Sequence, residues 1–413
     1  MSSPLIFHID VNSAYLSWEA AYRLQHGEEI DLRDVPSIVG GNREKRHGIV
    51  LAKSIPAKDY NILTGETIHS ALQKCPHLRV VPPNYERYID ASDAMIHILR
   101  EFSPNIQRYS IDEAFLDYSY GDKHWIDISY EIKERIKADL GFTVNIGVSS
   151  NKLLAKMASD FKKPDMVHSL FPYELQDKMW PLPVSELFMV GPKTTVKLHS
   201  RGIFTIGDLA ALSKDYIYSW LKKPGLLIWE YANGIDSSNV RNNPLPIKSV
   251  GNSTTTSFDV DNQREAHMIL LALSEKVSMR IRAINQCAYV VSLNIKNYNF
   301  FSYSRQVKLN NPTDSTNFVY RTAKRLFDEM WQEEPLRRFS LSLSELISND
   351  YYQLNFFEED DSKEKLLDNA IDNIRKSFGH KSVFRSCFLY SGIDPLIGGV
   401  IMEEEYPMMS SQI

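Results

Sequence analysis

The sequence predicts an α+β fold divided over several domains. Its 413 residues are more than one small core accommodates, so three or four domains are expected. Strand-like apolar runs alternate with helical patterns through the first 170 residues, which indicates layers of the α/β or split βαβ kind. Short helical pieces follow at 171–235, and strands return together with helices after residue 250.

Hydrophobic periodicity predicts the individual elements. Strands are expected at 4–9, 48–53, 112–118 and 143–148, and helices at 13–26, 66–75, 85–102, 124–139 and 151–160. The polar stretch 236–250 contains two prolines and is predicted to be an interdomain linker. Beyond it, a second α+β domain is expected, with strands at 254–260 and 287–296, helices at 262–284 and 315–332, and a later helix at 362–378.

Charge and cysteine content narrow the class of protein. Cys75, Cys287 and Cys387 are far apart and form neither a zinc motif nor a disulfide framework, which suits a reducing cytoplasm. Neither a signal peptide nor a membrane span is expected. The net charge is -5, but residues 346–413 alone carry 6 Lys+Arg against 12 Asp+Glu, which is -6. Residues 241–345 carry 14 against 10, which is +4 and permits a phosphate-binding face.

A single carboxylate stands at the end of the first predicted strand. The stretch FHIDVNSAYLSWEAA runs from an apolar segment into Asp10, and Asn12 follows just before a helical pattern. Asp and Asn both favour the residue that precedes a helix, so on this stretch alone a helix cap is the preferred interpretation. The alternative is a functional acid at the tip of a buried strand.

Two further acids, Asp112 and Glu113, stand side by side in the apolar stretch RYSIDEAFLDYSY. Neighbours on a strand point to opposite faces, so one acid can face a cleft while the other lies at its rim, or both can be solvated in a turn. Burying two carboxylates without counter-charges costs on the order of several kcal/mol, and metal ions are the obvious counter-charges. Together with Asp10, these acids predict a site for Mg²⁺, two ions of which assist in-line displacement at phosphorus.

Lysines follow the strand predicted at 143–148. Ser149 or Ser150 is expected to cap the next helix, whose N-terminus favours an anion. Four lysines lie on or after that helix: Lys152, Lys156, Lys162 and Lys163. A solvated helix face is the simpler explanation, but beside three acids these lysines are candidates to bind a triphosphate.

A helix-hairpin-helix pattern is predicted at 184–210. A helix is expected first, then a tight turn at Gly191 and Lys193, and then a second helix that ends near residue 203. Such a turn presents backbone N–H groups and a lysine to one DNA phosphate without reading bases. The pattern is weak by itself, because many helical hairpins contain glycine, and a similar turn is expected within 221–236.

The aromatic stretch YYQLNFFEED, 351–360, lies in an acidic neighbourhood after the last predicted domain. Exposed, it is a peptide that can dock in a partner's groove. The alternative is that it packs onto the body of the protein.

These motifs together resemble the Y-family translesion DNA polymerases, of the bacterial polymerase IV and V type. HIDVNSAYLSWE, YSIDEAFLD and GVSSNKLLAKMASDFKKPD are similar to the three catalytic motifs, and the resemblance covers about residues 5–345. It implies a right-hand architecture with a ferredoxin-like palm, small fingers, a helix-hairpin-helix thumb and an α+β little finger. The implied boundaries are palm 1–18 and 76–170, fingers 19–75, thumb 171–235, linker 236–250, little finger 251–345 and tail 346–413.

The resemblance also implies roles for single residues. Asp10, Asp112 and the Val11 carbonyl bind metal, and Glu113 lies beside the metal at the primer end. Lys58 and Lys163 hold the triphosphate of the incoming nucleotide. Tyr15 is the steric gate, whose ring clashes with a 2′-hydroxyl. DNA is held at the turn of Gly191 and Lys193. A sliding clamp is bound by the peptide 353–357, through Gln353, Leu354, Phe356 and Phe357, in the manner of Gram-positive-type members.

Four positions depart from the family pattern. Asn12 stands where the family often has a second acid, although the polymerase V branch also has Asn. Ala14 replaces a common Phe, which puts the packing of the gate in doubt. Lys58 stands where Arg is frequent and offers a point charge in place of a bidentate fork. Ile55 stands where many members have Tyr.

The expected function is low-fidelity, template-directed DNA synthesis past damaged bases, with two Mg²⁺ ions, primer-template DNA and dNTP. A monomer in the cytoplasm, associated with the nucleoid and not with a membrane, is expected. Two alternatives remain open at this point: a catalytically silent DNA-repair scaffold, and another two-metal nucleotidyl enzyme such as a cyclase.

Overall fold

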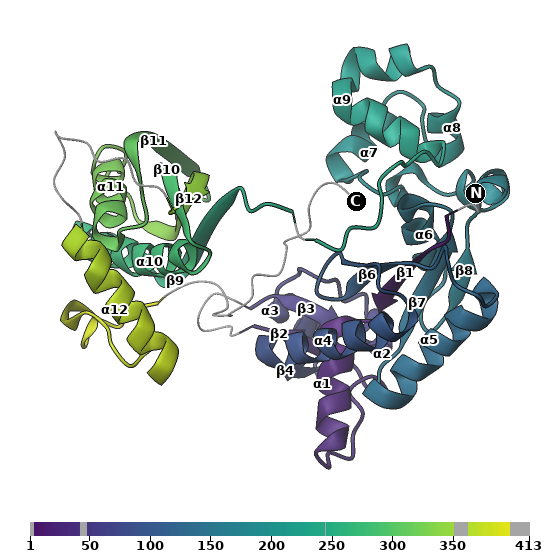
Figure 1. Cartoon of the computed structure of the whole chain (residues 1–413), viewed down its shortest axis with the longest axis horizontal. Coiled ribbons are helices and arrows are strands. Elements are labelled where there is room, and N and C mark those ends of the chain that lie inside the picture. The colour runs from purple at the N-terminus through teal and green to yellow at the C-terminus, as the bar shows by residue number, and fades with distance from the viewer. Residues whose placement is uncertain (1–3, 42–47, 244, 351–361, 397–413) are drawn as a thin grey trace. The chain divides into compact units, whose positions relative to one another are not determined.

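The structure is a computed structural model that describes residues 4–41, 48–243, 245–350 and 362–396. The chain folds as two compact units, one formed mainly by residues up to Leu245 and one that begins at Pro246 (Figure 1). Each unit has its own sheet and its own hydrophobic core, which confirms the predicted α+β multidomain class.

The first unit is built on a five-stranded sheet with β1 at its centre. In sheet order the strands are β5 (Ile106–Arg108), β6 (Glu113–Asp117), β1 (Ile6–Val11), β7 (Val144–Ser149) and β8 (Val167–Ser169). Neighbours are antiparallel except β7 and β8, which are parallel. The central strand therefore pairs on both sides, and groups at its end are flanked by β6 and β7.

The two faces of this sheet are covered by different helices. Phe7, Ile9 and Val11 of β1 belong to a core with residues of three helices: α1 (Ala14–Gln25), α4 (Tyr85–Phe102) and α5 (Trp125–Leu140). The opposite face lies against α6 (Lys152–Ser159). Gly147 allows this contact, because a Cβ there would lie 1.9 Å from the Ala155 carbonyl oxygen. The alternate residues of β1 thus face α6, since neighbours on a strand point to opposite faces.

A small three-stranded sheet with its own core lies within residues 37–81. Its strands, in sheet order, are β3 (Val50–Lys53), β2 (Ser37–Gly40) and β4 (Arg79–Val81). Two short helices accompany it, α2 (Ile55–Lys58) and α3 (Ile68–Lys74). Ile38, Val50 and Ile68 are buried in the core between them.

Residues 172–232 are helical, as predicted. The elements are two 3₁₀ turns (Pro172–Glu174 and Val184–Glu186), a π turn (Leu175–Met179), α7 (Pro192–His199), α8 (Ile206–Ala210) and α9 (Lys214–Ala232). The prediction of a first helix in the hairpin is wrong. Between residue 184 and Gly191 the chain forms one 3₁₀ turn, Val184–Glu186, instead of an α-helix. Leu187 takes an extended conformation, and both it and Val190 are buried in the core, which a continuous helix would not allow.

The second unit is a four-stranded antiparallel sheet with two long helices on one face. Its strands, in sheet order, are β11 (Ser302–Thr313), β10 (Gln286–Asn297), β12 (Leu336–Ser348) and β9 (Ser249–Val260), and its helices are α10 (Gln263–Ala283) and α11 (Thr316–Asp328). The predicted linker ends too late, because β9 already begins at Ser249.

The face of this sheet away from α10 and α11 carries small polar side chains. Leu341 and Leu343 of β12 are buried in the core with both helices, so the alternate residues face outward. Directly opposed outward residues form rows across the strands: Gln306–Ser292–Ser342–Gly251, Ser304–Asn294–Ser340–Ser253 and Ser302–Lys296–Arg338–Thr255. We call this the polar sheet face. Its hydroxyls and amides project little from the backbone, and Lys296 and Arg338 add two cations on longer side chains.

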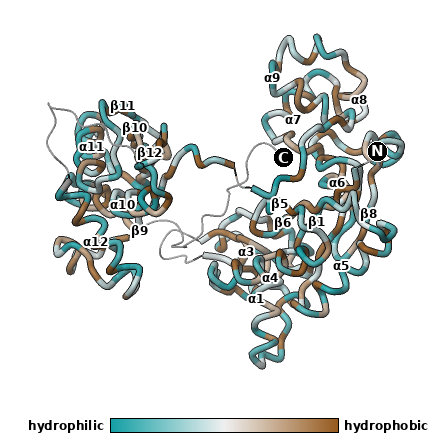
Figure 2. The backbone as a smooth tube through the Cα atoms, viewed as in Figure 1, coloured by the Kyte–Doolittle hydropathy of each residue, from teal (hydrophilic) through white to brown (hydrophobic). Residues whose placement is uncertain are grey.

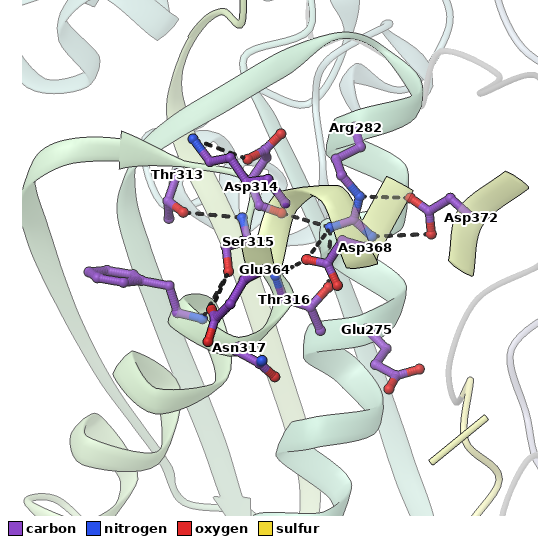
Figure 3. Close-up of polar contacts among 12 residues, drawn as sticks. Glu275, Arg282, Thr313, Asp314, Ser315, Thr316, Asn317, Glu364, Asp368 and Asp372 are labelled. Atoms are coloured by element: carbon purple, nitrogen blue, oxygen red, sulfur yellow. Dashed lines mark hydrogen bonds and ion pairs between the residues drawn. The ribbon is translucent and has the colours of Figure 1, made fainter. Parts of the chain in front are cut away.

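Part of the predicted tail belongs to the second unit. Helix α12 (Ser362–Phe378) forms where it was predicted and docks on α10 and α11 through charged groups (Figure 3). Arg282 on α10 pairs with Asp368 at 3.2 Å and with Asp372 at 2.7 Å. Asp368 also accepts the backbone N–H of Thr316, at 2.8 Å, in the first turn of α11, where a negative charge is favoured.

The anchor of α12 continues at Glu275, whose side chain is buried and accepts from Arg375 and from Arg385, each at 2.6 Å. Figure 2 colours α12 in alternating hydrophilic and hydrophobic stretches. It is the charged side that is buried, whereas Leu366, Leu367 and Phe378 are exposed. The helix is therefore held by buried ion pairs and not by an apolar face.

Candidate active site

Asp10 and Glu113 lie directly opposite each other on β1 and β6, and Asn145 lies opposite Asp10 on β7. Side chains of directly opposed residues share a face of the sheet, so these three form a row on the face that α6 covers. Asp112 comes immediately before β6, and its carbonyl oxygen accepts the N–H of Val11 at 3.0 Å. Strand pairing therefore brings Asp10 close to Asp112 and Glu113, which lie about a hundred residues later in the sequence.

The helix-cap interpretation of Asp10 is wrong. The residue before α1 is Ser13, in a left-handed conformation (φ 49°) and without a side-chain cap hydrogen bond. The Asp10 carboxylate instead accepts from Lys163 Nζ, 2.5 Å away. Asp10 therefore does not cap α1.

Two lysines supply positive charges next to the acids, in addition to the metal ions that the sequence predicts there. Lys163 also contacts Asp160, at 2.8 Å, and Lys156 donates to Glu113 at 2.7 Å. The interpretation of the lysines as a solvated helix face is wrong for Lys152 and Lys156, which are buried because α6 is enclosed between the sheet and the helical segment. Asn151, and neither Ser149 nor Ser150, caps α6.

Burial and neighbouring charges shift the pKa values of the three acids in different directions. Burial raises the pKa of Asp10 to about 7, although Lys163 opposes this shift. Burial likewise raises the pKa of Asp112. Burial alone would raise the pKa of Glu113 too, but His8 and Lys156 hold it well below its usual range. His8 is fully buried, with Nε2 at 3.7 Å from Glu113, and its own pKa is lowered by burial and by Lys156.

The donor set fits a divalent cation in its chemistry. Three carboxylates are hard oxygen ligands of the type that Mg²⁺ prefers. The raised pKa values of Asp10 and Asp112 indicate that both would gain from an added positive charge. Within the described ranges, however, no three His, Cys, Asp or Glu side chains are already arranged around a common metal position. Lys163 forms an ion pair with Asp10, and Lys156 forms one with Glu113.

Tyr15 lies in the first turn of α1 with its ring supported from behind. It stacks on Tyr88 of α4 at a centroid distance of 4.8 Å and an interplanar angle of 13°. Tyr85 meets it edge-on at 6.0 Å. Burial and the charge of Asp112 raise the pKa of Tyr15 to about 12.

Three further predicted residues, Lys58, Gly191 and Lys193, make no hydrogen bond or ion pair with the acids within the described chain. Lys58 is exposed at the end of α2. Gly191 is the N-cap of α7 and Lys193 is in its first turn, both exposed. Four predicted clamp-binding residues lie outside the described residues: Gln353, Leu354, Phe356 and Phe357.

Three residues of the site were missed by the sequence analysis: His8, Tyr88 and Asn145. A histidine inside an apolar strand two residues before Asp10 was a usable signal, because a buried polar group needs a partner. Tyr88 and Asn145 gave no local signal, since their contacts come from segments distant in the sequence.

Comparison with known proteins assigns the family. The impB/mucB/samB family model matches residues 9–160, and the model of the C-terminal domain of that family matches residues 247–356. A protein named DNA polymerase IV from Clostridium acetobutylicum is 45% identical over 390 residues, which are 94% of this chain and 98% of that protein. The chain belongs to the Y family of DNA polymerases.

Other matches agree with the Y-family assignment. A protein named DNA polymerase IV 2 from Bacillus subtilis is 36% identical over 400 residues, covering 94% of this chain and 95% of that protein. A solved Y-family DNA polymerase chimera has the same fold, with a TM-score of 0.72 at 21% identity, over 84% of this chain and all of that one. In the described part of this polymerase no helix is both long and apolar enough to cross a membrane.

Proposed function

We propose that this Y-family polymerase extends a primer on a DNA template and tolerates damaged bases in the template. The observation that carries the proposal is the opposition of Asp10 and Glu113 at the ends of β1 and β6, with Lys163 on Asp10, in a chain of this family. The primer 3′-hydroxyl attacks the α-phosphorus of a dNTP, a new P–O bond forms, the hydroxyl loses its proton and pyrophosphate leaves. The cyclase alternative loses its support with the family assignment.

Asp10, Asp112, Glu113 and the Val11 carbonyl would hold two Mg²⁺ ions, and such ions supply positive charge for an attacking hydroxyl and a leaving oxygen. The residues of the chain act by position and charge. Lys163, with Lys58 at the end of α2, holds the triphosphate. Tyr15 excludes a 2′-hydroxyl through a ring fixed on Tyr88.

We propose these domains: palm 1–18 and 82–170, fingers 19–81 with β4, thumb 171–235, linker 236–248, and little finger 249–348 with α12 docked on it. The thumb turn at Gly191 and Lys193 offers exposed N–H groups and a cation to a DNA phosphate. The polar sheet face of the second unit suits the sugar-phosphate backbone, because rows of hydroxyls and amides lie beside the opposed cations Lys296 and Arg338. The peptide 353–357 is proposed to bind a sliding clamp, and the polymerase to act as a monomer at the nucleoid in the cytoplasm.

Primer extension on undamaged and abasic templates with Mg²⁺ tests the proposal. Asp112→Asn is expected to lower the rate by more than about 100-fold, since loss of a group that merely supports a metal ligand already costs 10–100-fold. Asp139→Asn, which alters an exposed acid paired with Arg135, is the matched control. A wild-type protein without extension would favour the silent scaffold, and equal nucleotide turnover without primer-template would favour a cyclase.

DNA binding provides a second test. Phosphate contacts release counterions, so the affinity for primer-template should fall steeply with salt concentration. Arg338→Gln and Lys296→Gln together should reduce the slope of log K against log salt by about 2, because two cations are removed. An unchanged slope would mean that the DNA does not bind to the polar sheet face.

A further inference from the structure

Two buried asparagines tie the loop that carries Lys163 to the ends of the central strands. Asn12 follows β1, and Asn145 lies in β7 directly opposite Asp10; they are 7% and 0% exposed. Asn12 Nδ2 donates to Asn145 Oδ1 at 3.1 Å. We call Asn12 and Asn145 the asparagine pair.

The asparagine pair binds the Lys163 loop on both sides of the lysine. Before it, Asn145 Nδ2 donates to the carbonyl oxygens of Ser159, at 3.1 Å, and Lys162, at 2.7 Å. After it, the N–H of Asp165 donates to Asn12 Oδ1 at 2.9 Å, and the N–H of Met166 donates to Asn145 Oδ1 at 3.2 Å. Between these anchors, Lys163 Nζ reaches the Asp10 carboxylate.

The hydrogen-bond partners fix the orientation of both amides. A backbone N–H can only donate, so the Asn12 atom facing Asp165 must be the oxygen. That oxygen accepts a second hydrogen bond from Thr143 Oγ1 at 2.9 Å, so both of its lone pairs are used. Asn12 is therefore already committed as an acceptor, and its NH₂ group must face Asn145 Oδ1. A carboxylate at position 12 would set two oxygen atoms against each other there.

We propose that the asparagine pair positions Lys163 for the triphosphate of the incoming nucleotide, and that Asn12 serves this purpose and is not a metal ligand. The inference rests on the proposed role of Lys163. It also explains why an amide, and not the second acid found in many family members, suits position 12 in this chain. Asp165, held by Lys133 at 2.9 Å and Lys137 at 2.8 Å from α5, fixes the far end of the same loop.

The test measures nucleotide binding without chemistry. The full-length protein is bound to a primer-template with a dideoxy-terminated primer, and the correct dNTP is titrated in Mg²⁺. Asn12→Asp is expected to raise the Kd for dNTP about 10-fold or more, as for a buried hydrogen-bonding group left without its partner. In steady-state extension its KM for dNTP should rise more than its kcat falls. Affinity for primer-template should not change.

A double-mutant cycle with Lys163→Ala separates positioning from general stability. In the Lys163→Ala background, Asn12→Asp should add little to the Kd for dNTP. Equal effects in both backgrounds would overturn the inference, as would an unchanged Kd in the folded single variant. Thr143→Val removes one hydrogen bond to Asn12 and nearly preserves volume, so it provides the same test, with a smaller rise in Kd, if Asn12→Asp does not fold.

The cycle also distinguishes this inference from the proposed function. Lys163→Ala that extends primers but binds dNTP like the wild type would remove the triphosphate role of Lys163, and the inference with it, while leaving the polymerase activity established. A wild-type protein that binds no dNTP and extends no primer would instead refute the proposed function.

Discussion

Asp10 and Glu113 face each other across β1 and β6, yet each carboxylate is bound by a different lysine and their pKa values shift in opposite directions. Lys163 comes from a loop and is one-third exposed, whereas Lys156 comes from the buried face of α6. The pairing on Glu113 is therefore part of the folded core. The pairing on Asp10 involves a lysine that a triphosphate can attract away.

Removal of Lys156 should destabilise the protein. Lys156→Met leaves Glu113 buried without its cation, and loss of one partner of a buried pair costs about 3–5 kcal/mol. Chemical denaturation at pH 7 measures the change, and Lys123→Met, which breaks a solvent-exposed pair with Glu131, should have a much smaller effect because water screens that pair. Because the folded-state pKa of Glu113 is depressed, its contribution exists above about pH 4 and is lost as the pH falls further. The gap between wild type and variant should therefore narrow in acid, and a gap that stays constant would contradict the pairing.

Asp10 should have the opposite pH signature. Its pKa is raised from 3.8 to about 7 in the folded state, so the folded protein holds a proton that the unfolded chain releases between those values. Stability should consequently fall as the pH rises from about 4 to 7. Asp10→Asn removes this dependence, and its stability relative to wild type should increase by on the order of 1–3 kcal/mol between pH 5 and pH 8. Thermal unfolding without divalent metal measures this, and parallel pH profiles for the two proteins would refute it.

Sugar selection should depend on the stack of Tyr15 on Tyr88. Tyr15→Ala should remove most discrimination against ribonucleotides, because the ring is absent. Tyr88→Leu keeps apolar volume but loses an aromatic contact of about 0.5–1.5 kcal/mol, so discrimination should fall by about 2–10-fold. Tyr88→Phe keeps the ring and is the control. Single-nucleotide incorporation of dNTP and rNTP gives the ratio, and unchanged selection in Tyr15→Ala would remove Tyr15 from the gate role.

The anchor of α12 should contribute to the stability of the second unit. Glu275→Ala leaves Arg375, 4% exposed, buried without its carboxylate, and should cost about 3–5 kcal/mol. Lys381→Ala breaks an exposed pair with Asp394 and is expected to cost less than about 1 kcal/mol. Denaturation of the full chain, with hydrogen exchange on α12, measures both. Equal costs for the two variants would mean that α12 is not held by the buried ion pairs.

The clamp assignment makes a prediction about stimulation and not about basal activity. Replacement of Gln353, Phe356 and Phe357 by Ala should abolish stimulation of primer extension by a loaded sliding clamp. Extension without the clamp should be unchanged, because no step of the proposed chemistry uses these residues, which follow β12 in the sequence. If the clamp stimulates the variant as much as the wild type, these aromatic residues do not bind the clamp, and the alternative that they pack onto the protein is favoured.

The local pattern was sufficient for several elements that have a strong helical period or a clear apolar run. The helices at 85–102 and 362–378 lie where they were predicted, and β1, β3, β6 and β7 correspond to the predicted strands. Six strands were not predicted: the short strands β2, β4, β5 and β8, and the long strands β11 and β12. The four short strands have three or four residues each, too few to show a period of two. They form because neighbouring strands offer their backbone groups.

By itself the sequence determined the family, the order of the elements and the identity of the acids, because motifs and periodicity are local properties of the chain. Only the tertiary structure decided which lysine meets which acid, that Lys156 is buried, that Tyr88 supports Tyr15, and that Asn12 faces Asn145. These relationships join residues up to about 150 positions apart, and they depend on strand register and on the close approach of α6 at Gly147. No local pattern encodes such contacts, since they arise from the packing of whole elements against one another.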